Sequence, residues 1–571
     1  MNVNLVETFE EAETFMSWLG ERRPVLACDT ETGGLDWWRD ELRMVQFGDF
    51  ETGWSIPFHL WGGLALNAIK QYTGPITFHN AKFDVRYLNT HGANLSYTNV
   101  HDTRVMACLI DPAARSGLKD LATRWLGANS DDWESALKRT MALGKWTWAT
   151  VPVTSPEYWQ YAAMDTILTA RLHQKLKPMI TGRLEEIYEL EIAVEGIIDR
   201  MERKGVHIDL PYCKARAEEL AQTVEAIADW CVTKYGFGPG SNKKVADALI
   251  ADGIHLEKET AGGSYSVDET VLTNIDHPLA MYVLKSRKAA KYGNAYFSNY
   301  IDLADGDLLH PDVNTLGART GRMSISRPAL QQIPREKLLR DAFIPSAGNK
   351  LVSVDYDQIE MRLFAHFCQD PELIQAFKEE GDFFLNAASS IYGTRITDKK
   401  DDRRQLTKNA SYAIIYGAGC SRFAQTAGVS YDQASSFMAN YNRTFPGVEV
   451  FQKQLIALAR QRGIDEGHAY ITTPNGRRQP SEDDALFKLV NYLVQGTAAD
   501  IFKQSLVKLD DMGITEYFVL PVHDEVVFDV PEADAVAIGT EISATMERND
   551  FTVPLTCGVD ILDRWGDKYV D

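Results

Sequence analysis

The first third of the sequence carries four acids and one tyrosine whose types and spacing could do chemistry: Asp29, Glu31, Asp84, Tyr161 and Asp165. Asp29 and Glu31 follow a short apolar run and are two residues apart, so on a strand they project from the same face. Tyr161 and Asp165 are four apart in a helical pattern and share a face of that helix. Each piece alone more often caps a turn or packs in a core. As a set, carboxylates within one domain length could hold hard cations such as Mg²⁺ for phosphodiester hydrolysis.

A second set of acids stands in the later part of the chain. The apolar run 351–354 leads into Asp355, and a helix is expected directly after it. Asp524 and Glu525 lie between two β-rich runs, which indicates a hairpin with acids at its tip. An acid after a strand is more often a helix cap, and an acidic turn is more often only a turn. These acids therefore need other motifs beside them before they indicate a metal site.

Between these acids, Arg404, Lys408, Tyr412 and Tyr416 follow each other at steps of four. On a helix each step of four rotates by only about 40°, so the four side chains form one broad stripe. A chance amphipathic helix would place apolar residues on such a stripe instead of Arg and Lys. Two cations there suit a polyphosphate, and an aromatic ring suits stacking on a base.

Strands and helices must bring these side chains together. Short apolar runs over residues 25–28 and 76–80 indicate strands, and the pattern over 156–176 indicates a helix. From Gly182 apolar residues recur every three to four positions until Gly205, which ends a long helix. The first domain therefore ends near residue 180, and a mostly helical region follows to about residue 310.

The composition is that of a folded protein of two to four domains: 571 residues, 45% hydrophobic and 24% charged. No apolar run is long enough to span a bilayer, and the acidic N-terminus lacks the pattern of a secretory signal. The seven cysteines include no pair at CxxC spacing, which favours free thiols in a reducing cytoplasm over a zinc site or disulfides. We therefore expect a cytoplasmic protein without membrane contact.

The net charge of −21 argues against a nucleic-acid binder if it is taken alone. Nucleic acid responds to the local potential, however, and basic clusters occur at residues 285–291, 319–327 and 403–408. A charge cluster is usually a solvated face, so these clusters are only weak evidence. The stretch from Val283 to Tyr292 mixes cations with aromatics, as a surface that grips a duplex would.

The order of the acidic pieces in the first third resembles a known family. A DxE motif at Asp29, an NxxxD motif ending at Asp84 and a YxxxD motif ending at Asp165 look like the DEDY-type 3′→5′ exonucleases of the ribonuclease H-like superfamily. This resemblance implies that Tyr161 orients the attacking water. The metal ligands that it implies are Asp29, Glu31, Asp84 and Asp165. Asp102, a further acid of this region, is interpreted as structural.

The later segments resemble the sequence motifs of family A DNA polymerases. Residues 351–362 look like motif A, the stripe that starts at Arg404 looks like motif B, and residues 517–528 look like motif C. The flanking strings that also match are 320–322, 473–478 and 495–500. The early DxE motif points to the compact form found in bacteriophage enzymes of this family. The implied fold is α/β, with a ribonuclease H-like exonuclease domain beside a right-hand polymerase of palm, fingers and thumb.

The resemblance also implies roles at a polymerase site. Asp355 and Asp524 would hold two Mg²⁺ ions, for which Mn²⁺ can substitute, and Glu525 would support them as a further catalytic acid. Lys408 would hold the triphosphate with Arg404 and donate a proton to pyrophosphate. The residues expected to bind the nucleotide are Arg404, Lys408, Tyr412, Tyr416, Glu360 and Gln358. Those expected to contact DNA are Arg322, Asn491, Gln495 and His523.

The expected domains are an exonuclease domain at 1–180, a thumb with connecting helices at 181–310, palm at 311–370, fingers at 371–475 and palm again at 476–571. The implied partners are primer–template DNA and deoxynucleoside triphosphates. The chain is expected to be a monomer in the cytoplasm, that of the host cell if it is phage-encoded, and the sequence leaves open an unidentified processivity factor. Asp357 and Phe384 depart from the family, which usually has serine and histidine there, so details of the triphosphate contacts stay open.

Rival interpretations remain. The chain could be a nuclease-only repair protein with an inactive polymerase half, although the intact acids and the cationic stripe speak against this. It could instead be a single-subunit RNA polymerase or a non-catalytic scaffold. Glu360 stands at the family's sugar-discriminating position, which together with an exonuclease domain argues against RNA synthesis. Two complete sets of carboxylates argue against a scaffold.

Overall fold

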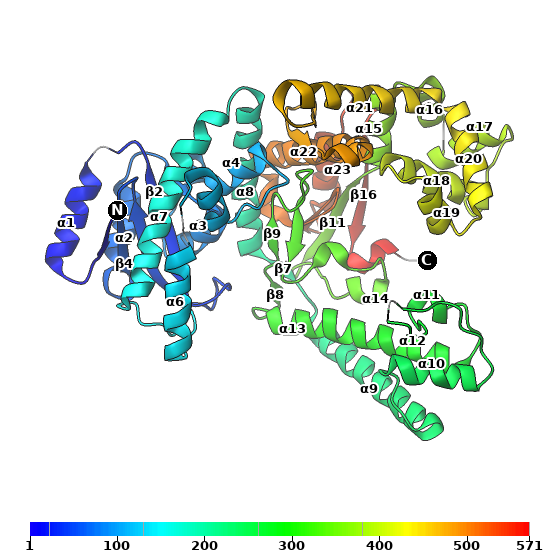
Figure 1. The fold of residues 1–571 in the computed structure, drawn as a ribbon, viewed down its shortest axis with the longest axis horizontal. Coiled ribbons are helices and arrows are strands. Elements are labelled where there is room, and N and C mark those ends of the chain that lie inside the picture. The colour runs from blue at the N-terminus through cyan, green and yellow to red at the C-terminus, as the bar shows by residue number, and fades with distance from the viewer. Residues whose placement is uncertain (22, 129–130, 261, 380, 570–571) are drawn as a thin grey trace.

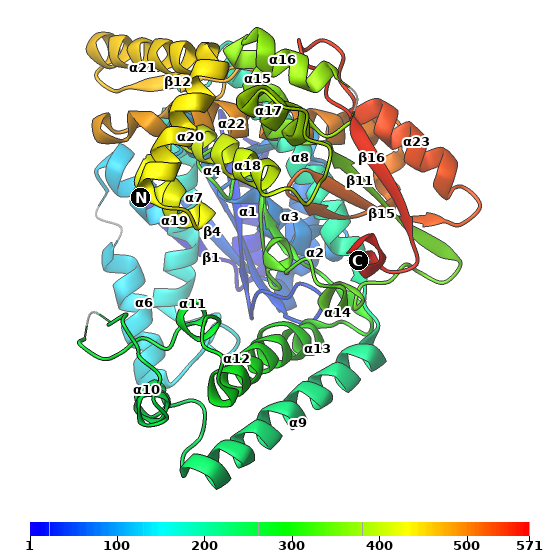
Figure 2. The ribbon, with the colours of Figure 1, turned by 90° about the vertical axis from the view of Figure 1, so that its right-hand side faces the viewer.

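The structure, a computed structural model, describes residues 1–21, 23–128, 131–260, 262–379 and 381–569. A six-stranded mixed sheet with its helices forms the N-terminal part, and a four-stranded antiparallel sheet lies at the centre of the rest. In Figure 1 the helices of residues 210–303 extend below this central sheet, and those of residues 371–466 lie above it and to its right. The turned view in Figure 2 keeps the two groups of helices on opposite sides. This arrangement of sheets and helices confirms the α/β class.

The N-terminal sheet runs in the order β1-β4-β3-β2-β5-β6. Its strands are β1 (Asn2–Leu5), β2 (Leu26–Thr32), β3 (Leu42–Gly48), β4 (Thr52–Pro57), β5 (Ile76–Phe78) and β6 (Val100–Asp102). Along β2, Asp29 and Glu31 alternate with fully buried residues, so both acids point to the same face. The strands predicted near residues 25–28 and 76–80 are present, and β2 extends through the two acids.

Helices cover this sheet: α1 (Phe9–Gly20), α2 (Phe58–Gln71), α3 (Ala81–Thr90), α4 (Thr103–Ile110), α5 (Leu118–Leu121), α6 (Asp131–Gly144) and α7 (Pro156–Leu176). α7 has the bounds that its sequence pattern predicted, and it packs on β2, β3 and β4. It starts with Pro156, whose missing N–H costs nothing in the first turn of a helix. The sheet and α7 therefore hold all five predicted residues of this domain except Asp84, which α3 carries.

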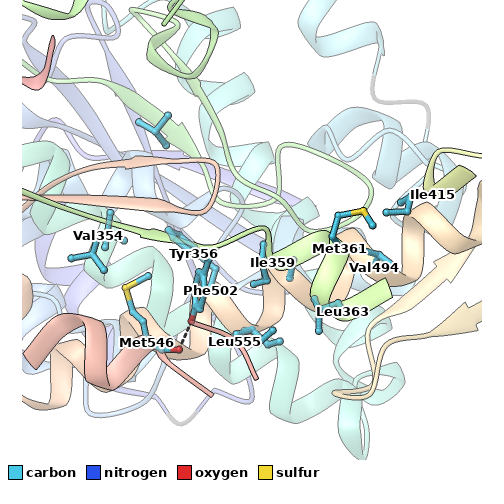
Figure 3. Packing of buried hydrophobic residues seen from close by; sticks show 14 of the residues in the cluster. Val354, Tyr356, Ile359, Met361, Leu363, Ile415, Val494, Phe502, Met546 and Leu555 are labelled. Carbon is cyan, nitrogen blue, oxygen red and sulfur yellow. Dashed lines mark hydrogen bonds between the residues drawn. The ribbon is translucent and has the colours of Figure 1, made fainter. Parts of the chain in front are cut away.

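The central sheet has the order β14-β15-β11-β16. Its strands are β11 (Asn349–Tyr356), β14 (Phe518–Val522), β15 (Glu525–Pro531) and β16 (Cys557–Leu562), and the helices beside it are α15 (Ile359–Cys368), α22 (Leu489–Asp511) and α23 (Ala535–Met546). Figure 3 shows the core beneath the sheet, where the Tyr356 hydroxyl donates a hydrogen bond to the Met546 carbonyl at 2.7 Å. Apolar side chains of β11, α15 and α22 pack together there, among them Val354, Ile359, Leu363, Val494 and Phe502. The predicted strand, following helix and hairpin are all present.

The long connecting helix, α8 (Arg183–Lys204), is bonded to both halves of the chain. One side of it packs on α3 and α4, and the other on α22. Its buried Glu202 accepts hydrogen bonds from Lys82 Nζ of α3 at 2.6 and 2.7 Å. Its buried Glu191 accepts hydrogen bonds from Lys503 Nζ of α22 at 2.7 Å. Two buried ion pairs on one helix therefore tie the N-terminal domain to the central region.

The lobe below the central sheet consists of α9 (Leu210–Tyr235), α10 (Asn242–Ala251), α11 (Glu269–Leu272), α12 (Pro278–Lys291), a π-helical turn (Tyr292–Ser298) and α13 (Asn299–Leu303). It has a small core of its own, which includes Ile227, Leu249, Leu279 and Val283. The lobe above consists of α16 (Pro371–Lys378), α17 (Phe383–Tyr392), α18 (Asp402–Ile415), α19 (Cys420–Ala427), α20 (Tyr431–Thr444) and α21 (Pro446–Glu466). No helix in the described ranges is long and apolar enough to cross a membrane.

Candidate active sites

The two acids of the central sheet meet through strand pairing. Asp355 on β11 lies directly opposite Glu525 on β15 in the antiparallel register. A two-residue turn joins β14 to β15, and His523 in it has a positive φ of 61°, which lets the chain reverse sharply. The Tyr356 N–H donates to the Asp524 carbonyl at 3.3 Å. The hairpin tip therefore lies at the end of β11, which brings Asp524 next to Asp355.

Burial sets the charges at this point. Burial, and then the charge of Asp524, raise the pKa of Asp355 to about 7. Burial also raises the pKa of Asp524, although the nearby guanidinium of Arg322 opposes that rise. Two carboxylates that are partly removed from water and repel each other favour a cation between or beside them. The site is therefore electrostatically suited to a divalent metal.

Glu525 is held differently from these two acids. One of its oxygens, Oε1, accepts hydrogen bonds from Ser353 Oγ at 2.6 Å and from the Trp565 indole at 3.2 Å. The same oxygen lies 3.2 Å from Lys568 Nζ. Its side chain is only 6% exposed. Three donors of the chain itself therefore hold one oxygen of Glu525, in contrast to Asp355 and Asp524.

The predicted stripe of motif B lies on α18. Arg404 forms a two-bond ion pair with Asp382, through Nε at 3.0 Å and a terminal nitrogen at 2.6 Å. Lys408 Nζ lies 5.9 Å from the ring centroid of Phe384. The rings of Tyr412 and Tyr416 stack with their centroids 6.2 Å apart. The stripe is therefore present, although its Arg404 pairs with an acid of the chain.

Glu360, the first-turn acid of α15, connects motifs A and B. It is 8% exposed and accepts a hydrogen bond from the Tyr416 hydroxyl at 3.1 Å. Arg322 also donates to its carboxylate. Gln358 stands just before this helix with a positive φ of 52°, and its side-chain oxygen is buried without a hydrogen-bond partner among the described residues. The unsatisfied oxygen is suited to a ligand donor.

The residues predicted to contact DNA lie near the same acids. Arg322, His523 and Asp524 line one cavity of about 20 Å³ with residues of α22. Asn491 and Gln495 are one turn apart on α22, and the buried Asn491 Oδ1 has no hydrogen-bond partner in the described part of the chain. Burial, and then the charge of Arg322, lower the pKa of His523 below its usual value.

The N-terminal acids gather on one side of the first sheet. Thr30 Oγ1 of β2 donates to Asp84 of α3 at 2.6 Å, which fixes this helix against the strand. Burial raises the pKa of Asp29 to about 6. Burial and the charge of Asp29 raise the pKa of Glu31 to about 8. As in the central site, buried acids that repel one another indicate a place for cations.

Lys119, which no sequence motif indicated, also lies within this acidic group. Its ammonium donates a hydrogen bond to Asp165 and lies 4.4 Å from the ring centroid of Tyr161. Burial lowers the pKa of Lys119 to about 8, while the charges of Asp29 and Glu31 oppose this. A single lysine in an ordinary helical segment carries no signal in the sequence, so only the fold places it here.

Asp102 is structural, as the sequence suggested. It is fully buried and accepts hydrogen bonds from the backbone N–H groups of Arg104 and Val105 at the start of α4. Its other oxygen accepts from Ala81 N–H at 2.6 Å, at the start of α3. One carboxylate therefore caps two helices.

The basic clusters differ from a continuous cationic surface. In the cluster 319–327, Arg319 pairs with Glu482, Arg322 with Glu360, and Arg327 with Asp36. On α12, by contrast, three lysines three residues apart are exposed: Lys285, Lys288 and Lys291. Val283 and Tyr292, which flank them, are buried. In the stretch from Val283 to Tyr292, the lysines are therefore exposed to a partner at the surface, whereas the aromatic ring of Tyr292 is not.

The donor sets fit divalent metals with oxygen ligands. In the described part of the chain, no group of three or more His, Cys, Asp or Glu side chains is arranged so that it could hold a metal ion. Magnesium, however, commonly binds through one or two carboxylates and completes its shell with water and substrate phosphates. Asp355 and Asp524 supply such a pair, and Asp29, Glu31, Asp84 and Asp165 supply the other acids.

Comparison with known proteins gives the family. A family model described as DNA polymerase family A matches residues 211–567, and one described as 3′-5′ exonuclease matches residues 3–181. A DNA polymerase of Mycobacterium phage L5 is 29% identical over 598 residues, which cover 100% of this chain and 97% of that protein. DNA polymerase I of Chloroflexus aurantiacus is also 29% identical, over 85% of this chain, which spans about half (54%) of that longer protein.

A solved structure shares the fold across almost the whole chain. It is the POL domain of Pol1 from M. smegmatis, in complex with DNA primer-template and dNTP. It matches with a TM-score of 0.80 and 24% identity, covering 99% of each chain. The chain therefore belongs to DNA polymerase family A and carries a 3′-5′ exonuclease domain at its N-terminus.

Proposed function

We propose that the central site adds deoxynucleotides to the 3′ end of a DNA primer on a DNA template, and that the N-terminal site removes wrongly added ones. The observation that carries this proposal is the strand register that places Asp355 beside the hairpin tip with Asp524. The hairpin tip lies near α18, because burial and then the charges of Glu360 and Asp524 raise the pKa of Tyr412. Glu360 joins these two motifs by accepting from Tyr416.

At the central site we assign Asp355 and Asp524 as the ligands of two Mg²⁺ ions, with Mn²⁺ as a substitute. The bound metal would lower the pKa of the primer hydroxyl and neutralise the charge that develops on pyrophosphate. Lys408 holds the triphosphate and is placed to donate a proton to pyrophosphate. Arg404 joins it by exchanging Asp382 for a phosphate, because a guanidinium binds either group with the same two-bond geometry.

The remaining contacts follow from position. Tyr412 stacks on the incoming base, with Tyr416 and Gln358 beside it, and Glu360 lies beneath the sugar. Arg322, Asn491, Gln495 and His523 contact the primer end and the duplex. Arg322 and His523 line the cavity next to Asp524, and Gln495 and Asn491 lie about one and two turns before the α22 residues of its lining. These residues would therefore check the shape of the new base pair and not its sequence.

At the N-terminal site we assign Asp29, Glu31, Asp84 and Asp165 as metal ligands and Tyr161 as the residue that orients the attacking water. A cavity of about 510 Å³ opens beside this site. It is lined by Leu35, Trp38 and Phe83, by the cations Lys82, Arg104 and Arg327, and by the acids Asp36, Glu195 and Asp312. The apolar side chains suit the stacked bases of an unpaired DNA end, whose phosphates would have to compete with the acids for the cations.

We also propose the division of the polymerase into thumb (181–310), palm (311–370 and 476–571) and fingers (371–475), with the exonuclease domain at 1–180. The separate hydrophobic core around α10 and α12 supports the thumb. A monomer in the cytoplasm, in the host if the chain is phage-encoded, fits this function, and a processivity factor remains open.

The test is to separate the two activities. Removing a metal ligand should cost orders of magnitude in its own reaction, since the ions supply several kcal/mol of charge stabilisation. Asp29→Ala with Glu31→Ala should abolish degradation of single-stranded DNA and spare extension, and Asp524→Ala should do the reverse. Degradation at the native rate in the Asp29→Ala/Glu31→Ala protein would refute the exonuclease assignment.

One primer-extension assay with Mg²⁺ and either dNTPs or rNTPs decides among the rivals. Extension with dNTPs alone supports the proposal. Extension with rNTPs supports an RNA polymerase, and degradation without extension supports a nuclease-only protein. If neither extension nor degradation occurs, the result supports a non-catalytic scaffold.

A further inference from the structure

The C-terminal end of the described chain forms a short 3₁₀ helix, η8 (Trp565–Tyr569), against the central sheet (Figure 1). Trp565 is 1% exposed and packs edge-on against Phe343 at 5.4 Å. The guanidinium of Arg340, on α14 (Lys337–Arg340), lies 4.0 Å from the ring of Trp565 and 4.5 Å from that of Tyr569. These contacts anchor the segment on both sides of residue 568.

Lys568, in the middle of this segment, reaches onto one face of the sheet. Ser353 and Asp355 are two apart on β11 and share a face. Glu525 pairs directly opposite Asp355, and Asp560 of β16 directly opposite Ser353, so both point to that same face. The other face carries Val352 and Val354, which are fully buried in the core.

All four of these side chains surround the lysine. Lys568 Nζ donates to Ser353 Oγ at 2.9 Å and lies 3.2 Å from Glu525 Oε1. It lies 3.6 Å from an oxygen of Asp355 and 3.6 Å from one of Asp560. The lysine side chain is 13% exposed, whereas Asp355 is 38% exposed. The largely buried ammonium of Lys568 therefore lies among three carboxylates from three neighbouring strands.

We propose that Lys568 is a positioning residue of the polymerase site, which holds the carboxylate of Asp355 in the orientation that binds the metal. Asp355 is surrounded by the charges of Asp524 and Glu525, and repulsion from both would turn it outward toward water. The lysine offsets that repulsion and pairs with Glu525 Oε1. This inference rests on the proposed function, because it requires that Asp355 binds a metal there.

The anchoring contacts make the inference testable. Trp565, Arg340 and Phe343 hold the segment without the lysine, so removal of its charge should leave the fold intact. Lys350 offers a matched control, because it lies near the start of β11 in the same central sheet and also pairs with acids, Asp563 and Glu532. Those acids are more than half exposed and lie outside the site.

The experiment compares Lys568→Met, Lys568→Arg and Lys350→Met in a shared Asp29→Ala/Glu31→Ala background, which removes exonuclease metal binding. Free Mn²⁺ is titrated without DNA or nucleotide and followed by electron paramagnetic resonance. Single-nucleotide incorporation is then measured across Mg²⁺ concentrations. Lys568→Met should weaken Mn²⁺ binding about tenfold, the effect of a lost charge-assisted contact. It should also slow incorporation at low Mg²⁺, with recovery at high Mg²⁺ and an unchanged KM for dNTP.

Lys568→Arg should stay within about threefold of the background, because a guanidinium keeps the charge, and Lys350→Met should match the background. Unchanged or tighter Mn²⁺ binding in Lys568→Met would overturn the proposal, since the lysine would then be neutral to the metal or its competitor. An equal loss in Lys350→Met would overturn it as well. If the background protein itself fails to extend a primer, the proposed function fails and not this inference.

Discussion

At the residue scale, the side chains of the α18 stripe and Glu360 are the ones that we expect to set substrate choice. Tyr412 packs between Phe384, at 6.1 Å between ring centroids, and Tyr416, at 6.2 Å. Phe384 occupies the place where the family usually has histidine, and its ring is tilted by 43° to that of Tyr412 and lies 5.9 Å from Lys408 Nζ. We expect this apolar ring to hold Tyr412 without competing for the phosphates of a nucleotide.

Tyr412 should make the enzyme accept dideoxynucleotides. Burial raises the pKa of Tyr412 to about 12, so the hydroxyl stays protonated and can fill the polar gap that a missing 3′-hydroxyl leaves. A lost hydrogen bond in a dry site costs roughly 1–3 kcal/mol, or about ten- to hundredfold. Tyr412→Phe should therefore reject ddNTPs by that factor while normal extension continues. The ratio of kcat/KM for dNTP and ddNTP measures this, with the exposed Tyr431→Phe as control. Equal ratios in Tyr412→Phe and native protein would leave this tyrosine with a stacking role only.

Glu360 should exclude ribonucleotides. Its buried carboxylate is held by Arg322 and by the Tyr416 hydroxyl, so it cannot move aside for a 2′-hydroxyl. Overpacking of this kind costs about 1–3 kcal/mol, and Glu360→Ala should raise relative rNTP incorporation by about ten- to hundredfold. The measurement is kcat/KM for rNTP over that for dNTP, compared with Glu372→Ala, an exposed acid of α16. An unchanged ratio in Glu360→Ala would contradict the steric role of Glu360.

At the scale of elements, α3 and α8 form the junction of the two catalytic domains. α3 carries Asp84 on one side, and Lys82 and Arg86 on the side that faces α8. Both cations bind Glu202, which is fully buried. The orientation of a predicted exonuclease ligand therefore depends on an ion pair with the connecting helix.

Breaking that pair should destabilise the junction and impair the exonuclease more than the polymerase. Glu202→Gln removes the shorter carboxylate contact of two buried cations, Lys82 and Arg86, which keep only the longer contacts to Asp312 and Asp199. This loss costs up to about 3–5 kcal/mol. Denaturant unfolding should show the loss, and degradation of single-stranded DNA should slow while primer extension is retained. Glu189→Gln, an exposed acid on the same helix, should change neither. Equal losses in both activities would mean that the junction does not position Asp84 specifically.

At the scale of the whole molecule, an acidic protein must still bind a polyanion. The net charge is −21, and many cations of the basic clusters are paired within the chain. The exposed lysines of α12 lie on the lobe opposite the fingers helices (Figure 2). Binding should therefore depend on local positive faces and not on total charge.

DNA affinity should fall steeply with salt in spite of the acidic total. Each neutralised phosphate releases counterions, and the slope of log affinity against log salt is about −0.9 per contact for duplex DNA. Lys285→Gln with Lys291→Gln should flatten that slope by about two units if both contact phosphates. The control, Lys70→Gln with Lys175→Gln, removes the same charge from the exonuclease domain. A native slope in the first pair would show that α12 does not lie along the duplex.

Much of this protein could be predicted from local sequence. The bounds of α7, the long helix α8, the strand before Asp355 and the hairpin at Asp524 follow from periodicity and from residues within a few positions. The residue types of both acidic sets and of the α18 stripe indicated their chemistry, since carboxylates suit hard cations and Arg with Lys suit phosphates. Asp102 was also interpreted as structural from the sequence; its cap on α4 is a local interaction, whereas its hydrogen bond from Ala81 N–H at the start of α3 is not.

Only the tertiary structure decided which charges meet. The pairing of Arg404 with Asp382, of Lys119 with Asp165 and of Lys568 with Glu525 joins residues that no sequence pattern connects. Their contacts arise where helices and strands converge, and a lone lysine or aspartate reads locally as a solvated surface residue. Burial then changes what such a group does, because a charge removed from water must find an opposite charge. The acids were therefore determined by the sequence alone, whereas the cations that hold them in place were determined by the packing of the fold.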